Sequence, residues 1–429
     1  ESTQFYSDSA GPDRATIIED NEEALKMRLR VIKDAKKTLI LSTFDFRSDD
    51  AGKDVLAALL NAADRGVKVE IFADGFNSII QMENNDYFYA LSSNGNVKII
   101  IYNQVNILTP WNGLGRMHDK YVIADDSLYI LGGRNTFGYF LGDYAGHKNY
   151  DRDVLVYNTG SKDSSIYQLK DYYKKITSQK CCSVFHNNES FGEKNSVKKA
   201  EQELKNRYES LENKYDKFLA ENYDYKANTY ETNKINLLSN PTSLYAKQPT
   251  VYYGLMYLAK NARKEVKIHT PYIICNDYMY NELKNIKVPT TIMTNSAENN
   301  GNIFGAVDYL NHKKDIINTG VTIKEYEGGI SYHGKSMTID DDIAIVGSFN
   351  MDMRSAYIDT ELMLVINSKD INKQLKASME EYEKKAATVK NETEYSHIPE
   401  GMKMKELSDK KKNIKAWFGW AMNGLRFLF

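Results

Sequence analysis

The chain has 429 residues, 42% hydrophobic and 27% charged, so it can bury a sizeable core and is not a disordered polyelectrolyte. Lys and Arg total 56 and Asp and Glu total 58, a formal net charge of −2. That balance argues against a nucleic-acid coat protein, which needs a basic excess to neutralise phosphates. Three cysteines exclude a disulfide scaffold and a cysteine-rich zinc module, and no run of 18 apolar residues predicts a transmembrane helix.

Helices and strands are predicted to alternate along two stretches of the chain. Residues 21–37 and 54–65 carry apolar residues at helical spacing, and a buried-strand pattern follows each of them, at 38–44 and 67–72. Further strands are expected at 97–102, 120–124, 128–131 and 154–157. The same order restarts with a helix at 251–263 and strands at 265–272, 290–294, 322–326, 336–339, 344–346 and 362–366. The pattern predicts an α/β fold of two duplicated halves, each a mostly parallel mixed sheet flanked by helices.

The domain borders follow from this repeat. The first half is expected at 1–160 and the second at 246–390, with a helical insert at 161–245 and a tail at 391–429. Apolar residues three or four apart over 196–223 predict a long amphipathic helix in the insert. That helix either packs on the body or contacts a partner or a membrane.

The tail combines basic and aromatic residues. Lysines at 410, 411, 412 and 415 precede an apolar end with Trp417, Phe418, Trp420, Leu425, Phe427, Leu428 and Phe429. A basic cluster followed by aromatic residues suits the headgroup layer of a membrane, and a C-terminal helix docked on the body is the alternative.

One motif occurs twice and dominates the sequence. HxKxxxxD is formed by His118, Lys120 and Asp125, and again by His333, Lys335 and Asp340. Six residues later come Gly132-Gly133-Arg134-Asn135 and Gly347-Ser348-Phe349-Asn350. The Asn follows the His at the same distance in both copies, since 135 − 118 and 350 − 333 both equal 17. Such matched spacing indicates a duplicated functional motif.

The residue types indicate phosphate chemistry. Residues i and i+2 of an extended segment share a face, so each His projects together with its Lys. Pairing of the duplicates brings two imidazoles, two ammonium groups and two carboxamides to one site where the halves meet. Lys and Asn suit a phosphate diester, while one imidazole attacks phosphorus and the other protonates the leaving oxygen. We expect no metal and no other cofactor, because the lysines stabilise the developing charge.

These motifs resemble the duplicated HxKxxxxD-x6-G[SG]xxN motifs of the phospholipase D superfamily, and within it those of bacterial cardiolipin synthases. The narrower similarity rests on Ala62–Val69, Thr270-Pro271-Tyr272, Thr294-Asn295-Ser296, Gly320-Val321, Tyr326-Glu327 and Asn350–Ser355 running on to Glu361-Leu362. It covers about 15–160 and 250–390. The first motif has Gly133 where the second has Ser348, a variant that cardiolipin synthases also contain.

The resemblance implies a role for each motif residue. His118 is expected to be the nucleophile and His333 the general acid and base, although the two roles could be exchanged. Lys120, Lys335, Asn135 and Asn350 would hold the phosphate, with a further hydrogen bond from Ser348. Asp125 and Asp340 belong to the catalytic motifs but are expected to lie further out and brace the fold.

Two acidic residues are expected to orient the imidazoles, as the acid of a catalytic triad does. We expect Asp153 and Glu361 in this role, because each opens a following strand in the similar family, with Asp151 as a rival for Asp153.

The favoured function is a cardiolipin synthase-like phosphatidyl transfer that acts on phosphatidylglycerol, with phosphatidylethanolamine as a second candidate, through a phosphatidyl-histidine. The alternatives are a phospholipase D that hydrolyses phospholipids, a nuclease or phosphodiesterase with the same site, and a binding scaffold without turnover. The net charge argues against a nucleic-acid partner. We expect membrane association in a bacterial cell, through the tail or through an anchor before Glu1.

Overall fold

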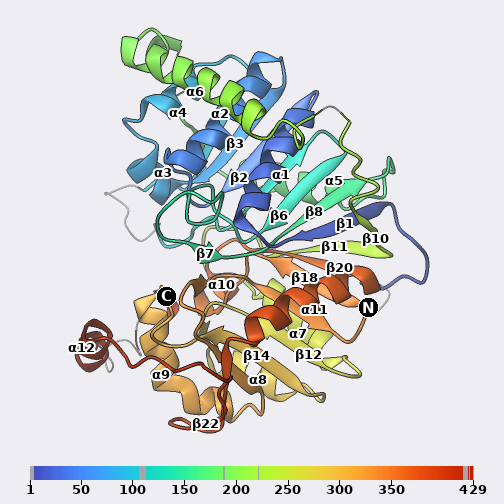
Figure 1. Ribbon diagram of the computed structural model, residues 1–429, viewed down its shortest axis with the longest axis vertical. Coiled ribbons are helices and arrows are strands. Elements are labelled where there is room, and N and C mark those ends of the chain that lie inside the picture. The colour runs from blue at the N-terminus through green and yellow to red at the C-terminus, as the bar shows by residue number, and fades with distance from the viewer. Residues whose placement is uncertain are drawn as a thin grey trace.

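Two halves, each built on a nine-stranded sheet, lie one above the other in the computed structural model (Figure 1). The structure describes residues 4–105, 113–186, 189–220, 222–418, 424 and 426–428.

The first sheet has the order β10 (Tyr230–Glu231), β1 (Asp13–Ile18), β8 (Asp153–Asn158), β6 (Leu128–Gly132), β5 (Tyr121–Ala124), β2 (Thr38–Thr43), β3 (Lys68–Asp74), β4 (Val97–Tyr102) and β9 (Cys182–Val184). The second has the order β11 (Lys234–Ser239), β20 (Leu362–Asn367), β18 (Ile343–Gly347), β17 (Ser336–Ile339), β12 (Val266–His269), β14 (Thr290–Asn295), β15 (Thr322–Tyr326), β21 (Ala386–Val389) and β22 (Tyr395–His397). From β8 to β4 and from β20 to β15 the two orders match strand for strand. The protein is therefore a duplicated α/β fold.

Both sheets are mixed, but the parallel part is smaller than predicted. Only β2–β3–β4 and β12–β14–β15 pair in parallel within the two large sheets, and the other strand pairs are antiparallel. Connection length explains part of this: three residues join β5 to β6, and so short a link permits only an antiparallel hairpin.

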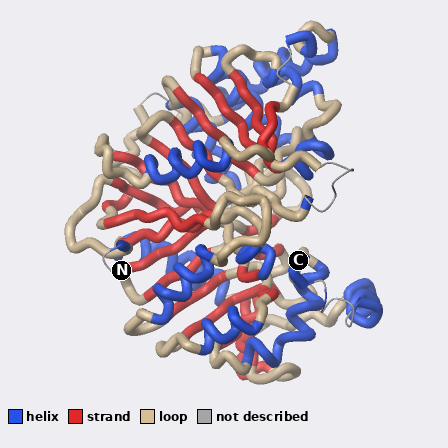
Figure 2. The backbone as a smooth tube through the Cα atoms, turned by 180° about the vertical axis from the view of Figure 1, so that it is seen from behind, coloured by secondary structure: helices blue, strands red, loops and turns tan. Residues whose placement is uncertain are grey.

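Helices lie around both sheets, on their outer sides and between the two halves (Figures 1 and 2). They are α1 (Asn21–Asp34), α2 (Asp50–Asp64), α3 (Gly75–Gln81), α4 (Asp86–Ser92), α5 (Ile166–Thr177), α6 (Asn195–Lys214), α7 (Thr250–Lys260), α8 (Asp277–Lys284), α9 (Ile303–Ile317), α10 (Met353–Tyr357), α11 (Lys369–Glu383) and α12 (Asp409–Phe418). Each half has its own apolar core, and a third core is shared by both halves, with side chains of α5 and α11 in it. This shared core fixes the halves against each other.

The stretch 161–245 is more than a helical insert. Its helix α6 ends at Lys214, earlier than predicted, and buries its apolar side against α2 and α4, so it packs on the body. The same stretch adds β9 and β10 to the first sheet and β11 to the second. The chain therefore crosses from one half to the other between β10 and β11.

Short strand contacts join the halves beside the duplicated motifs. Parallel pairing links β7 (Asn149–Tyr150) to β16 (Ser331–Tyr332), which directly precedes His333. An isolated parallel bridge links Met117, which directly precedes His118, to Thr360. Each motif thus begins against a strand segment of the opposite half.

Candidate active site

Both motifs lie at the junction between the halves. His118 and Lys120 occupy an extended segment just before β5, and His333 and Lys335 one just before β17. Both segments contact the opposite half: the backbone N–H of His118 donates to Thr360 Oγ1 (3.2 Å) and that of His333 to Tyr150 O (2.6 Å).

The two histidines and the two lysines of the motifs share one site. Burial, together with the charges of Lys120 and Lys335, holds the pKa of His118 well below its usual value. Burial and the same two lysines lower the pKa of His333 to about 4. Burial also lowers the pKa of Lys120 to about 7 and lowers that of Lys335. Since each lysine acts on both imidazoles, the two motifs form a single cationic site.

Each imidazole contacts an acid from the other half. His118 Nδ1 lies 2.9 Å from Glu361 Oε1, and His333 Nδ1 lies 2.6 Å from Asp151 Oδ2. Both carboxylates are fully buried. An acid at Nδ1 fixes the ring and leaves Nε2 for chemistry, so the site needs both halves to be complete.

Asp153 was expected beside an imidazole, and this expectation is wrong. Its carboxylate pairs with Arg28 (2.8 Å) and Arg134 (3.2 Å) inside the first half. The register explains why: Asp153 pairs with Gly132, and the equivalent Gly347 pairs with Met363. The position equivalent to Glu361 therefore lies two residues before Asp153, at Asp151.

Ser348 supports the acid that contacts His118. Its hydroxyl donates to Glu361, as does the Ser355 hydroxyl (2.7 Å). Ser348 therefore helps to hold Glu361, and its hydrogen bond to a phosphate stays a prediction. Gly133, at the equivalent position of the first motif, leaves space that Asp151 fills, since an added Cβ would lie 2.3 Å from Asp151 Oδ1.

The two motif asparagines are buried at the edge of the site. Asn135 Oδ1 accepts from the backbone N–H of Asp45 (3.3 Å), which leaves its amide donors for another group. Asn350 Nδ2 donates to the Tyr272 hydroxyl (3.1 Å). Tyr272 had no predicted role, although it belongs to a stretch that carried the family resemblance.

Aromatic rings flank both imidazoles. The ring of Phe44 lies edge-on to His118 with 5.3 Å between centroids, and that of Phe140 lies edge-on to His333 at 5.1 Å. Neither ring was predicted at the site from the sequence, because neither residue belongs to the repeated motif.

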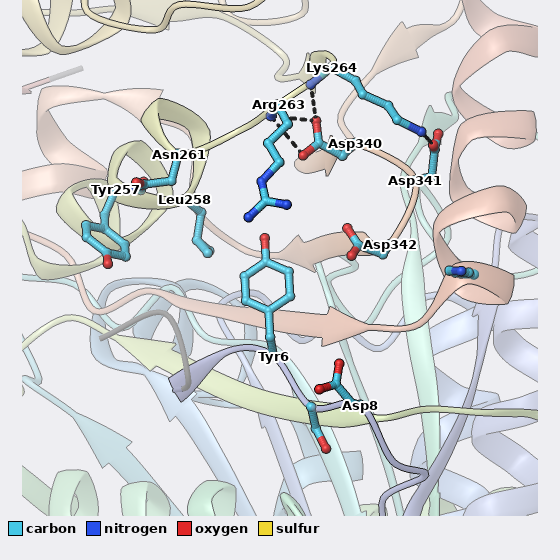
Figure 3. Close-up of a pocket in the computed structure, with 12 residues that line it drawn as sticks. Tyr6, Asp8, Tyr257, Leu258, Asn261, Arg263, Lys264, Asp340, Asp341 and Asp342 are labelled. Carbon is cyan, nitrogen blue, oxygen red and sulfur yellow. Dashed lines mark hydrogen bonds and ion pairs between the residues drawn. The ribbon is translucent and has the colours of Figure 1, made fainter.

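Asp125 and Asp340 lie away from the imidazoles and brace loops. Asp125 accepts from the backbone N–H groups of residues 36, 37 and 38, and Asp340 from those of residues 263, 264 and 265. Figure 3 shows Asp340 with Arg263 and Lys264 at the wall of a cavity of about 770 Å³. None of the residues that line this cavity contacts a motif histidine, so it lies outside the cationic site.

The two acids differ electrostatically. Burial would raise the pKa of Asp151, but Lys335 and His333 outweigh it and hold that pKa well below its usual range. Burial raises the pKa of Glu361 to about 7, despite the opposing effects of Lys120 and Ser348. The duplicated site is therefore asymmetric: Asp151 stays ionised at neutral pH, whereas Glu361 titrates there.

The fold and the paired motifs define a two-half enzyme of the phospholipase D superfamily. The family described as "Cardiolipin synthase, PLD-like domain" matches residues 29–176 and 255–382, and the chain belongs to it. Cardiolipin synthase 1 of Staphylococcus aureus is 26% identical over 90% of this chain and 70% of its own length. Cardiolipin synthase B of Salmonella typhi is 25% identical over 85% of this chain and 79% of its own length.

A solved structure shows the same architecture. The phosphatidylserine synthase of Haemophilus influenzae superposes with a TM-score of 0.68 over 97% of this chain and 95% of its own, at 15% identity. At that identity the likeness concerns the fold. Among the helices that the structure describes, none is both long and apolar enough to cross a bilayer.

Proposed function

We propose that this protein is a phosphatidyltransferase that converts phosphatidylglycerol to cardiolipin through a phosphatidyl-histidine intermediate. The observation that carries the proposal is the pair of imidazoles in one cationic site, each fixed at Nδ1 by an acid of the opposite half. The names of the related cardiolipin synthases support the choice of substrate.

In the first step, Nε2 of His118 attacks the phosphorus of the donor lipid. The P–O bond to the headgroup breaks, and His333 gives its Nε2 proton to the departing glycerol oxygen. In the second step, neutral His333 takes a proton from a glycerol hydroxyl of a second phosphatidylglycerol. That oxygen attacks phosphorus, the P–N bond breaks, and His118 is restored. Two phosphatidylglycerol molecules thus give one cardiolipin and one glycerol.

The electrostatic asymmetry supports this division of roles. A nucleophile must be neutral, and burial with the two lysines lowers the pKa of both imidazoles, so the two roles are separated by the acids rather than by these shifts. A general acid must carry a proton, and ionised Asp151 favours an imidazolium at His333. An anionic phosphate diester between Lys120 and Lys335 offsets the positive charge that lowers the pKa of His333, so substrate binding promotes its protonation.

The test uses vesicles of phosphatidylglycerol and phosphatidylethanolamine, with products measured by mass spectrometry. We expect cardiolipin from the unsubstituted chain and none from His118→Ala or His333→Ala. His147→Ala is the matched control, because His147 is exposed and its ring contacts Asn149 and Tyr139 rather than a residue of either motif. Phosphatidic acid as the main product would show that water, rather than a lipid, is the acceptor.

A second measurement separates the roles of the two histidines. With a phosphodiester whose leaving group needs no proton, His333→Ala should accumulate a phosphorylated His118, found by peptide mass spectrometry. His118→Ala should form no adduct. An adduct on His333 in the latter variant would exchange the two assignments.

We also propose that the C-terminal tail binds the membrane surface. Within the tail, Trp417 is 79% exposed and Phe427 is 43% exposed, which suits the headgroup layer. Trp420, Leu425 and Phe429 lie outside the described residues, as does the side chain of Phe418.

A further inference from the structure

Exposed apolar side chains gather on three segments of the chain. Of the nine exposed Phe, Trp, Ile, Leu and Val side chains among the described residues, six lie on α3, at residue 114 and in the last part of the chain from residue 417 onward. These are Phe76 (50% exposed), Ile79 (40%), Ile80 (59%), Leu114 (40%), Trp417 (79%) and Phe427 (43%). Single exposed apolar residues need no explanation, but a gathering of them indicates an interaction surface.

Helix α3 is attached to the active site. Asp74, which caps it, accepts from the backbone N–H of Met117 (3.0 Å), the residue before His118. Asn77 Nδ2 donates to the carbonyl of Phe44 (3.2 Å), whose ring flanks His118. The exposed side chains of Phe76, Ile79 and Ile80, called here the α3 rim, therefore lie on a helix that is held against the His118 segment of the first half.

Arg354 on α10 connects the other two segments to the same site. Its guanidinium donates to the carbonyl of Leu114 (2.6 Å), four residues before His118, and to that of Leu428 (3.3 Å). Arg426 pairs with Asp308 (2.7 Å) and thereby holds the end of the tail on α9. In Figure 1, α3, α12 and the C-terminus lie on the side of the molecule opposite the N-terminus, and α10 lies nearer the centre.

Helix α12 adds positive charge on this side. Lys411 is turned inward and donates to the carbonyls of residues 297, 298 and 300. Lys410, Lys412 and Lys415 are exposed, next to exposed Trp417. Three cations beside an aromatic residue match an anionic headgroup layer.

We propose that this side of the protein is a bilayer-docking surface for anionic phospholipid, in which the α3 rim inserts between acyl chains while α12 binds headgroups. The inference rests on the proposed function, since a phospholipid with two acyl chains reaches a buried pair of lysines most directly when the site opens onto the headgroup plane. It adds a contact from the first half, so that the bilayer is held on both sides of the site.

The experiment measures sedimentation of the full chain with vesicles of phosphatidylcholine, alone or mixed with phosphatidylglycerol. Ile79→Asp/Ile80→Asp should weaken binding to the mixed vesicles at least about ten-fold, because two inserted side chains become charged. Ile398→Asp is the matched control: Ile398 is 43% exposed and follows β22 at the far end of the second half, so binding should not change. Lys410→Gln/Lys412→Gln/Lys415→Gln should remove the preference for phosphatidylglycerol.

A second readout does not depend on the loss of a function. Phe76→Trp should show added fluorescence quenching by brominated acyl chains, compared with the unsubstituted chain. Unchanged vesicle binding in the Ile79/Ile80 variant, an equal loss in the Ile398 control, or no added quenching each overturns the proposal. So does concentration-dependent dimerisation that the Ile79/Ile80 substitutions abolish while vesicle binding persists, because a second copy then covers the rim.

Failure of the docking surface and failure of the proposed function give different results. Binding through the α3 rim without turnover of any phospholipid supports the surface and refutes the function. Cardiolipin formation on vesicles that is unaffected by the rim substitutions refutes the surface and leaves the function standing.

Discussion

Replacement of Asp151 by Asn tests the crossed pairing of the two halves. Asn retains the size of the side chain and an oxygen that can accept from His333 Nδ1, but it removes the negative charge that lies 2.6 Å from that atom. Asp153→Asn is a matched control. Asp153 lies two residues away, is equally buried, and pairs with Arg28 and Arg134 rather than with an imidazole.

The size of the effect follows from Coulomb's law. Two unit charges about 4 Å apart, roughly the separation of the centres of a carboxylate and a hydrogen-bonded imidazolium, attract by about 4 kcal/mol at an effective dielectric constant near 20. At about 1.4 kcal/mol for each factor of ten, loss of this attraction in the transition state lowers kcat by about 10³. KM should change little, because Lys120, Lys335 and both asparagines remain.

The assay uses a soluble chromogenic phosphodiester, so that the result does not depend on membrane binding. It measures kcat and KM, with thermal unfolding of the same preparations. Asp151→Asn should lose about a thousand-fold in kcat. Asp153→Asn should lower the free energy of unfolding by about 3 kcal/mol, because it leaves two arginines buried with a neutral partner, and should retain kcat where it is folded.

The opposite pattern refutes the reasoning. If Asp153→Asn loses kcat while remaining folded and Asp151→Asn does not, the acid that orients His333 is the one expected from the sequence. If Asp151→Asn is as active as the unsubstituted chain, the imidazolium at His333 needs no charged partner.

Three further predictions concern the acid at the other imidazole, the loop braces and the unequal motifs. Because burial raises the pKa of Glu361 to about 7, its negative charge beside His118 is lost as the pH falls through that value, so kcat should fall below about pH 7 and Glu361→Gln should flatten this limb of the pH profile. Asp340→Ala should lower the free energy of unfolding by about 2 kcal/mol in thermal melts, since three backbone N–H groups lose a charged acceptor, and Asp340→Asn should cost less because Asn tolerates the left-handed backbone (φ 51°). Gly133→Ser makes the first motif more like the second but should lower kcat, because its Cβ would lie 2.3 Å from Asp151 Oδ1, and a fully active variant would contradict that packing.

Much of the fold was predictable because the duplication shows in the local sequence patterns of both halves. Helical and strand periodicities recur in the same order, and the matched spacing of the two motifs indicates one site made from two halves. The direction of neighbouring strands in the sheets was predicted less well from the sequence. Alternation of helices and strands predicts parallel pairing, which the large sheets show for β2–β3–β4 and β12–β14–β15. The three-residue links of β5–β6 and β17–β18 make antiparallel hairpins instead.

The position of the acids required the tertiary structure. Asp151 and Asp153 both stand at the start of β8, and nothing in their local sequence shows which of them faces a histidine 182 or 180 residues away. The choice is made by pairing of β7 with β16 and by the register of β8 against β6, both long-range contacts. The hydrogen bond from the Ser348 hydroxyl to Glu361 likewise could not be predicted from the motif that Ser348 shares with Asn350, because it depends on tertiary structure.

The sequence by itself therefore determined the duplicated fold and the chemical groups of the site: two imidazoles, two ammonium groups and two carboxamides. Those depend on residue identity and on spacing within short segments. The tertiary structure decided which acid serves which imidazole, how the two acids differ in charge, and which exposed apolar side chains border the site. Those features depend on distances between segments that are far apart in the chain. A shift of two residues in strand register would place Asp153, which pairs with buried arginines, where Asp151 now orients His333.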